Sequence, residues 1–199
     1  MPQYFVLKCL SPPTADHYVL QVDDELRSLD WYAGALFAAN SGDAERRPPP
    51  EPIEVRTYLE KGPHVYPELT WSPIPLMTRR LVTALQSAGI DTLQTFATKL
   101  VAPEGSPPPP EDLYLAVNLI GLVAAADLRK SLLNPDVSDR LISADFLSLA
   151  VDPAKARGLL LFRLAENVSA VIVHESARKA VEGAGIDTLS WLKPERWAG

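Results

Sequence analysis

The residues best suited to catalysis or metal binding are few in this sequence. It contains three histidines, His17, His64 and His174, and a single cysteine, Cys9. The histidines lie far apart, without H-x-H or H-E-x-x-H spacing, and no cluster of carboxylates accompanies them. One cysteine allows neither an intramolecular disulfide nor a cysteine-based zinc site, and Cys9 lies in an apolar run typical of a core strand. The sequence therefore predicts no metal site, no cofactor and no reactive thiol.

Motifs for nucleophilic or nucleotide chemistry are also absent. His174, Glu175 and Ser176 are the residue types of a serine triad, but neighbours at a strand-to-helix junction are expected to point in different directions, and Ser176 is better interpreted as a helix start. No G-x-S-x-G, G-x-G-x-x-G or G-x-x-x-x-G-K-[ST] occurs. We therefore predict that the protein is not an enzyme. The alternative is an enzyme or small-molecule binder whose site is assembled from His64, His174 and Asp127.

The net charge of −6 is unevenly distributed along the chain. Between Asp16 and Glu45 seven acids oppose only Arg27, and the segment from Leu100 to Asp127 has acids but no base. An acidic surface repels the phosphates of nucleic acid and attracts a basic protein, although acids also serve solubility alone. The candidate partner-binding residues are acids and two neighbouring aromatics: Asp23, Asp24, Glu25, Asp30, Trp31, Tyr32, Glu111 and Asp112. Trp31 and Tyr32 are either interface anchors or core residues.

These residues must be positioned by strands and short helices. Apolar and β-branched runs predict strands at Tyr4–Leu10, His17–Val22 and Ile53–Leu59, and a hairpin over Gly158–Val173. A helix is expected after Asp23, with Leu26, Leu29, Ala33 and Phe37 on one face. The run from Leu113 to Asp127 is ambiguous, and we expect a strand that enters a helix near Ile120.

One stretch occurs twice. The hexapeptide AGIDTL spans Ala88–Leu93 and recurs at Ala184–Leu189, each time after a segment with helical spacing of apolar residues. Thr78 and the Glu175-Ser176 pair are expected to start the two helices, and Gly89 and Gly185 to end them, because glycine adopts the left-handed conformation without a clash. Either a duplication or a coincidence on a common turn would explain the repeat.

Length and composition favour one domain. A chain of 199 residues can bury a substantial core, and its nineteen prolines, about twice the usual frequency, cluster in predicted surface loops at 41–52 and 102–112. The start of the chain lacks the basic and apolar pattern of a signal peptide. The longest apolar run, Leu113–Ala126, contains Asn118 and is shorter than the roughly 20 residues of a membrane span. We expect a cytoplasmic protein that does not contact a membrane.

Four stretches resemble a known family: Pro73–Asp91, Leu113–Ser131, Leu159–Leu189 and the closing Trp191-Leu192. They are similar to the immunity proteins of bacterial polymorphic toxin systems, specifically the family typified by a myxobacterial nuclease-immunity protein and once known only as a domain of unknown function. The resemblance covers roughly residues 71–192 and consists of apolar and turn residues. It implies a protein that binds and blocks a cognate toxin, with no reaction of its own.

These observations together predict an α+β protein with a single immunity-type domain over residues 1–199. We expect a mixed or antiparallel sheet with packed helices and a C-terminal hairpin-helix-strand module. The predicted function is neutralisation of a cognate bacterial toxin, a basic protein and possibly a nuclease, through the acidic stretches. The alternatives are the enzyme or small-molecule binder described above and an adaptor of a secretion system.

Overall fold

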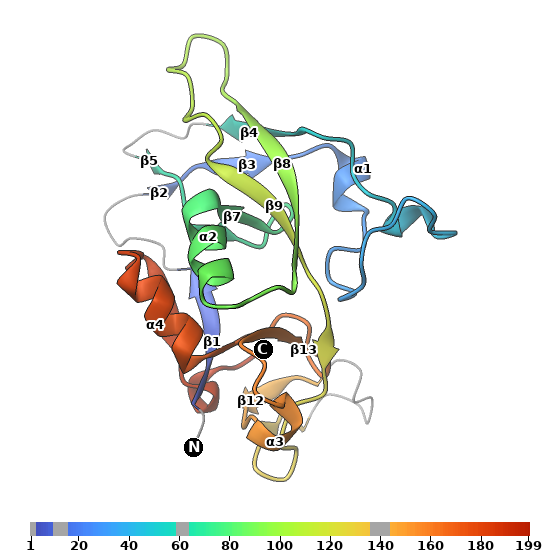
Figure 1. The fold of residues 1–199 in the computed structure, drawn as a ribbon, viewed down its shortest axis with the longest axis vertical. Helices are drawn as coiled ribbons and strands as arrows, with labels where there is room; N and C mark the ends of the chain where they lie inside the picture. Colours follow the sequence, from blue (N-terminus) through green and yellow to red (C-terminus); the bar gives the residue numbers. More distant parts are fainter. Residues whose placement is uncertain (1–2, 10–15, 59–63, 136–143) are drawn as a thin grey trace.

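The computed structural model describes residues 3–9, 16–58, 64–135 and 144–199, and most of its strands lie in two sheets (Figure 1). The larger sheet is six-stranded, with β4 and β8 parallel and the other neighbours antiparallel. Its order is β3 (Val19–Gln21), β4 (Ile53–Tyr58), β8 (Leu93–Val101), β9 (Tyr114–Leu119), β7 (Leu76–Thr78) and β6 (Leu69–Thr70).

The second sheet is five-stranded and includes the N-terminal strand. Its order is β10 (Leu122–Val123), β13 (Leu161–Leu164), β14 (Val171–His174), β1 (Tyr4–Cys9) and β15 (Leu189–Leu192). Only β10 and β13 are parallel in it. Two small ladders complete the strands: β2 (Asp16–His17) with β5 (His64–Val65), and β11 (Leu132–Leu133) with β12 (Phe146–Ser148). The prediction of an α+β fold with mixed sheets is confirmed.

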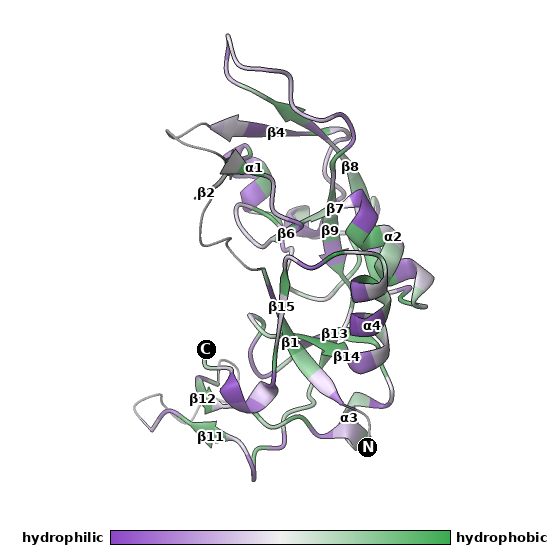
Figure 2. Cartoon of the chain, turned by 90° about the vertical axis from the view of Figure 1, so that its left-hand side faces the viewer, coloured by the Kyte–Doolittle hydropathy of each residue, from purple (hydrophilic) through white to green (hydrophobic). Residues whose placement is uncertain are grey.

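The helices are short and lie on different faces. They are α1 (Asp24–Arg27), α2 (Arg79–Ser87), α3 (Pro153–Ala156) and α4 (Glu175–Gly183), with 3-10 turns η1 (Ala44–Arg46) and η3 (Pro194–Arg196). Helices α2 and α4 pack side by side (Figures 1 and 2) and share a core with Val117 and Leu119 of β9. On the opposite face of β9, Tyr114 and Ala116 pack with Leu26 of α1. Because strand side chains alternate between faces, α1 and α2 lie on opposite sides of the six-stranded sheet.

A third core fills the other face of the five-stranded sheet. There Val6, Phe162 and Ile172 pack with Phe146 of β12 and Trp197. The hydrophobic colour of β1, β13 and β14 in Figure 2 reflects burial on both faces, since α4 covers one side and this third core covers the other. Such double burial explains why these strands are almost continuously apolar in sequence.

The two copies of the repeated sequence form the same arrangement of elements. In the first copy, β7, α2 and β8 follow one another, and β9 lies between β7 and β8 antiparallel to both. In the second copy, β14, α4 and β15 follow one another, and β1 lies between them in the same way. Each copy is also preceded by a hairpin strand, β6 or β13, on the same flank.

The register of the inserted strands matches as well. Ala116 of β9 pairs with both Leu76 and Phe96, whereas Val6 of β1 pairs with both Ile172 and Leu192. The same sequence offset separates Leu76 from Ile172 and Phe96 from Leu192. Coincidence on a common turn does not account for matching topology and register, so the structure favours duplication of a split β-α-β unit.

Two sequence predictions about helices were wrong. The helix that starts near Asp23 ends at Arg27, and the chain that follows is irregular up to β4 except for η1. Beyond Arg27 the N–H of Asp30 donates to the carbonyl of Glu45 at 2.9 Å, outside any helix. Gly34 then excludes a helix that continues to Phe37, because it adopts φ +68° and lies against Gly121 and Leu122, where a Cβ atom would lie only 2.8 Å from Leu122. Side chains from the sheet then bind the irregular backbone: Gln94 accepts from the N–H of Phe37 and donates to its carbonyl, both at 2.9 Å.

The helix predicted after Ile120 is also absent. The strand part is correct, since β9 ends at Leu119, but Gly121 turns the chain with φ +95° and the next residues form β10. There they pair with β13, a partner distant in sequence that the local pattern could not reveal. The predicted strand at 53–59 and the hairpin of β13 and β14 are confirmed within the described residues, whereas Leu10 and Leu59 lie outside them. The loop at 102–112 projects between β8 and β9 (Figure 1).

Candidate functional site

The acids predicted for partner binding in the N-terminal segment gather around α1 and η1. Three of them form ion pairs: Asp23 with Arg56 at 3.2 Å, Asp24 with Arg27 at 3.2 Å, and Asp30 with Arg46 at 3.6 Å. The arginines of η1 and β4 therefore offset part of the negative charge that the sequence concentrates between residues 16 and 45. Glu25 carries no ion pair within the described residues, and the side chain of Asp24 is 96% exposed. Exposed pairs of this kind contribute little to stability, so these carboxylates are available to a partner.

The second acidic pair lies elsewhere. Asp112 is bound to Arg79 at the start of α2, with 3.4 Å between Oδ1 and Nη2. Since α2 and α1 occupy opposite faces of the six-stranded sheet, Glu111 and Asp112 do not join Asp23, Asp24 and Glu25 in one surface. We name the two groups by their positions: the α1–η1 surface (Asp23, Asp24, Glu25, Asp30, Asp43 and Glu45) and the Glu111–Asp112 pair.

The two aromatic candidates have different environments. Trp31 is 1% exposed, packs edge-to-face against Phe37 and Phe96, and donates from Nε1 to the carbonyl of Leu26 at 2.8 Å. Of the two roles expected for Trp31, interface anchor or core residue, the structure shows the core residue, and a partner cannot reach its side chain in this structure. Tyr32 is half-buried and donates its hydroxyl to the carbonyl of Trp71. Burial raises the pKa of the Tyr32 phenol.

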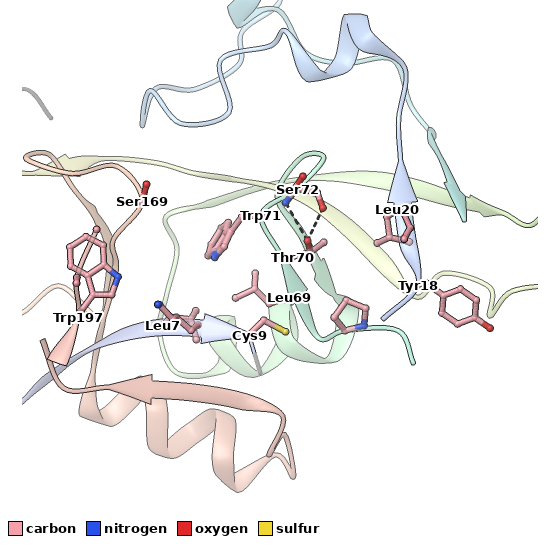
Figure 3. Close-up of a pocket in the computed structure, with 15 residues that line it drawn as sticks. Leu7, Cys9, Tyr18, Leu20, Leu69, Thr70, Trp71, Ser72, Ser169 and Trp197 are labelled. Atoms are coloured by element: carbon pink, nitrogen blue, oxygen red, sulfur yellow. Dashed lines mark hydrogen bonds between the residues drawn. The ribbon is translucent and has the colours of Figure 1, made fainter. Parts of the chain in front are cut away.

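A groove of about 590 Å³, which the sequence did not indicate, opens between the two sheets (Figure 3). Its walls come from the end of β1, from β3, from β6 with Trp71, and from residues 197–199. In Figure 3 the side chains of Leu69, Trp71 and Cys9 lie close together in it. Burial raises the pKa of the Cys9 thiol, which therefore stays protonated near neutral pH and is no nucleophile. The described residues that line the groove are mostly apolar and aromatic, with Lys8 as the one charged side chain among them.

Beside this groove lies a second cavity of about 280 Å³, lined by Tyr32, Trp71, Arg163, Val168 and Ser169. Arg163 of β13 is 1% exposed, and its guanidinium carbon lies 4.8 Å from the ring centre of Tyr32 and 5.2 Å from that of Trp71. Burial lowers the pKa of Arg163 to about 10. The sequence analysis missed this residue because it lies in the middle of the strand LFRL, whose other residues are all apolar and buried.

The residues of the enzyme alternative do not form a site together. His64 belongs to β5, His174 ends β14, and Asp127 follows β10, where its N–H binds the carbonyl of Ala150. Strand β5 lies toward one end of the long axis, and the part of the chain near α3 toward the other (Figure 1). Asp127 is paired with Lys130 at 2.9 Å. This arrangement gives the assembled site no support.

His174 and Ser176 interact, contrary to the expectation that they point apart. Nδ1 of His174 accepts from the backbone N–H of Ser176 at 3.2 Å and lies 2.7 Å from its hydroxyl. His174, rather than Ser176, therefore caps α4. Thr78 is confirmed as the equivalent cap of α2, since its hydroxyl accepts from Leu81 N–H at 3.3 Å. The His174 contact is thus a structural cap, and it has an equivalent in the other copy of the repeat.

Two other kinds of site are absent from the part of the chain that the structure describes. No three histidine, cysteine, aspartate or glutamate side chains there are grouped so as to hold a metal ion. None of the helices there has both the length and the apolar character needed to span a bilayer.

Comparison with known protein families places the chain in one of them. The sequence model of the immunity protein family Imm11 matches residues 12–195. This range contains the segment 71–192 in which the resemblance was seen, and it adds most of the N-terminal seventy residues, including the α1–η1 surface. No curated protein matches the chain.

Proposed function

Because the chain belongs to the Imm11 immunity protein family, we propose that it binds a cognate bacterial toxin and covers the toxin's active surface. The family match over residues 12–195 is the observation that carries this proposal. A protein that inhibits a toxin by covering its active surface needs a complementary surface and no catalytic groups. The separation of His64 in β5 from Asp127 near α3, along the long axis of the molecule, supports a mode of action without catalysis.

The α1–η1 surface is the interface that we propose for the toxin. It contains more carboxylates than arginines, and Glu25 and Asp24 are open to solvent. The Glu111–Asp112 pair is a weaker candidate because Arg79, at the start of α2, forms an ion pair with Asp112 and offsets its charge. An acidic surface steers a basic partner toward it and speeds association at low ionic strength.

The toxin is, in this proposal, a basic protein of a polymorphic toxin system, and a nuclease fits best. A nuclease needs lysine and arginine side chains where it binds the phosphate backbone of its nucleic-acid substrate. The carboxylates of an inhibitor can bind these same side chains in place of the substrate. The immunity protein would then act in the cytoplasm, where it protects its own cell during competition between bacteria. It binds no nucleic acid and no membrane in this account.

Coexpression tests this function. A candidate toxin, chosen from the products of the neighbouring genes, is expressed in a host cell with and without the chain, and growth is followed. We expect toxin alone to arrest growth and the chain to restore it. Continued arrest in the presence of soluble chain would contradict the proposal. Binding to a secretion component without any protection would instead favour an adaptor.

A further inference from the structure

Arg163 is a buried cation that lacks a carboxylate partner among the described residues. Only Nη1 has a hydrogen bond, to the carbonyl of Val168, whereas Nε and Nη2 are buried without any partner. Burial lowers the pKa of Arg163, and among the described residues the Tyr32 phenol, not a carboxylate, is the group that opposes this shift. Buried charges are normally paired, because an unpaired one loses its hydration without compensation. The contacts with Tyr32 and Trp71 compensate in part, since a guanidinium is attracted to aromatic faces.

The two unpartnered nitrogens have a specific geometry. Nε and Nη2 form one edge of the planar guanidinium, the edge that binds a carboxylate through two parallel hydrogen bonds. Nη1, which is already used, lies away from this edge. The structure therefore leaves one complete bidentate donor pair unoccupied beside a cavity of about 280 Å³. A cavity of this size lies just below the range of about 300–1,000 Å³ typical of ligand pockets.

The residues that line the cavity indicate the chemical class of the anion that it would bind. Tyr32, Trp71 and Val168 offer aromatic and aliphatic surface, and Arg163 supplies a single positive charge. A phosphate monoester brings nearly two negative charges and three acceptor oxygens, which one guanidinium cannot satisfy. A monocarboxylate matches both the single charge and the two parallel donors.

We propose that Arg163 binds a carboxylate group whose apolar body occupies the space between Tyr32, Trp71 and Val168. Because Nε and Nη2 are buried, a carboxylate reaches them only after a neighbouring side chain moves. The indole of Trp71 is the group that we expect to turn, since it lines both this cavity and the neighbouring groove. The carboxylate comes either from a small organic acid in solution or from an acidic side chain of a bound protein. The second source rests on the proposed function, and the first does not.

Calorimetric unfolding of the isolated protein tests the first source. The Tm is measured with propionate or benzoate against chloride and phosphate at constant ionic strength. We expect a saturable rise for the carboxylates, about 3–6 °C at ten times the Kd, and none for phosphate. Arg163→Met should abolish the rise while its own Tm stays equal to or above that of the wild type. Arg163→Lys keeps the charge but loses the bidentate edge, so it should bind at least tenfold more weakly.

Arg178→Met is the matched control. Arg178 also packs on an aromatic ring, that of Phe5 at 4.6 Å, but it is paired with Glu182 at 2.8 Å. The carboxylate response should survive in this variant. If the carboxylate comes from an acidic side chain of a bound protein, Arg163→Met and Arg178→Met are each titrated with the toxin. Only Arg163→Met should weaken the complex, by tenfold or more. A response to carboxylates that is unchanged in Arg163→Met overturns the proposal. It is equally overturned if the Arg163→Met substitution changes neither the carboxylate-induced rise in Tm nor the affinity for the toxin.

Discussion

Ile90 and Ile186 occupy equivalent positions at the ends of the two principal helices. The N–H of Ile90 donates to the carbonyl of Leu85 at 3.2 Å, and that of Ile186 to the carbonyl of Val181 at 3.4 Å. Each follows a glycine with positive φ, Gly89 at +93° and Gly185 at +74°. Both isoleucine side chains then enter the core between α2 and α4. The repeated AGIDTL thus ends a helix and returns the chain to a sheet twice, and it is structural in both places.

This equivalence predicts similar costs for two substitutions. Gly89→Ala and Gly185→Ala should each lower the free energy of unfolding by about 1 kcal/mol, because a side chain disfavours the left-handed conformation. Steric contacts add little, since an added Cβ atom would lie 3.7 Å from Leu160 at Gly89 and in open space at Gly185. Urea unfolding measures both values. Gly183→Ala is the control: Gly183 is helical and uncrowded, so alanine there should be neutral or stabilising. Equal effects at all three glycines would contradict this account.

Tyr114 predicts a pH dependence of stability. Its hydroxyl is fully buried and donates to the carbonyl of Pro67 at 2.5 Å, and burial raises the pKa of the phenol well above its ordinary value of 10.0. Above pH 10 the unfolded chain releases this proton and the folded chain keeps it, so stability must fall as pH rises. Tyr114→Phe should cost about 1 kcal/mol at pH 7 and show a weaker loss between pH 10 and 11. Parallel slopes for the two proteins in alkaline urea titrations would refute the assignment.

Gln94 predicts a link between the sheet and the α1–η1 surface. Its side chain forms both hydrogen bonds to the backbone of Phe37, in the irregular segment that carries Asp30 and η1. Gln94→Ala should leave these backbone groups unpaired, lower stability by about 1–3 kcal/mol and speed amide exchange at Phe37. Hydrogen exchange with mass spectrometry provides the measurement, and Lys99→Ala, an exposed change on the same strand, provides the control. Unchanged exchange at Phe37 would show that other contacts hold the segment.

Burial of Trp31 predicts that its substitution acts through folding. Trp31→Ala should cost about 3–5 kcal/mol, as for other large core side chains, whereas Tyr32→Ala should cost less because Tyr32 is half-buried. Chemical denaturation of both variants makes the comparison. A small effect of Trp31→Ala would mean that the indole is accessible and would restore it as an interface candidate.

The sequence was informative where local patterns determine the structure. Thr78, Gly89 and Gly185 mark helix ends that depend on the nearest few residues, and the alternation of Ile53, Val55 and Thr57 identifies β4. The sequence-based predictions failed where contacts with residues distant in sequence determine the secondary structure. The close approach of Gly34 to Gly121 brings together segments that are distant in sequence, and β10 exists because β13 lies beside it.

The candidate site shows the same division. Charge counting identified the acids of the α1–η1 surface, but it did not reveal that Arg46 and Arg56 fold back onto them. Arg163 gave no local signal, since its importance arises from Tyr32 and Trp71, which come from other parts of the chain.

Toxin binding through the α1–η1 surface is measured as the affinity of the purified chain for its toxin at low salt. Isothermal titration compares the wild type with the double variant Asp24→Lys, Glu25→Lys and with Glu111→Lys, an unpaired glutamate on the other face. We predict a tight wild-type complex that high salt weakens, an affinity loss of about tenfold or more for the double variant, and less than a twofold change for Glu111→Lys. No association at low salt, or equal affinities for the wild type and the double variant, would contradict toxin binding through the α1–η1 surface.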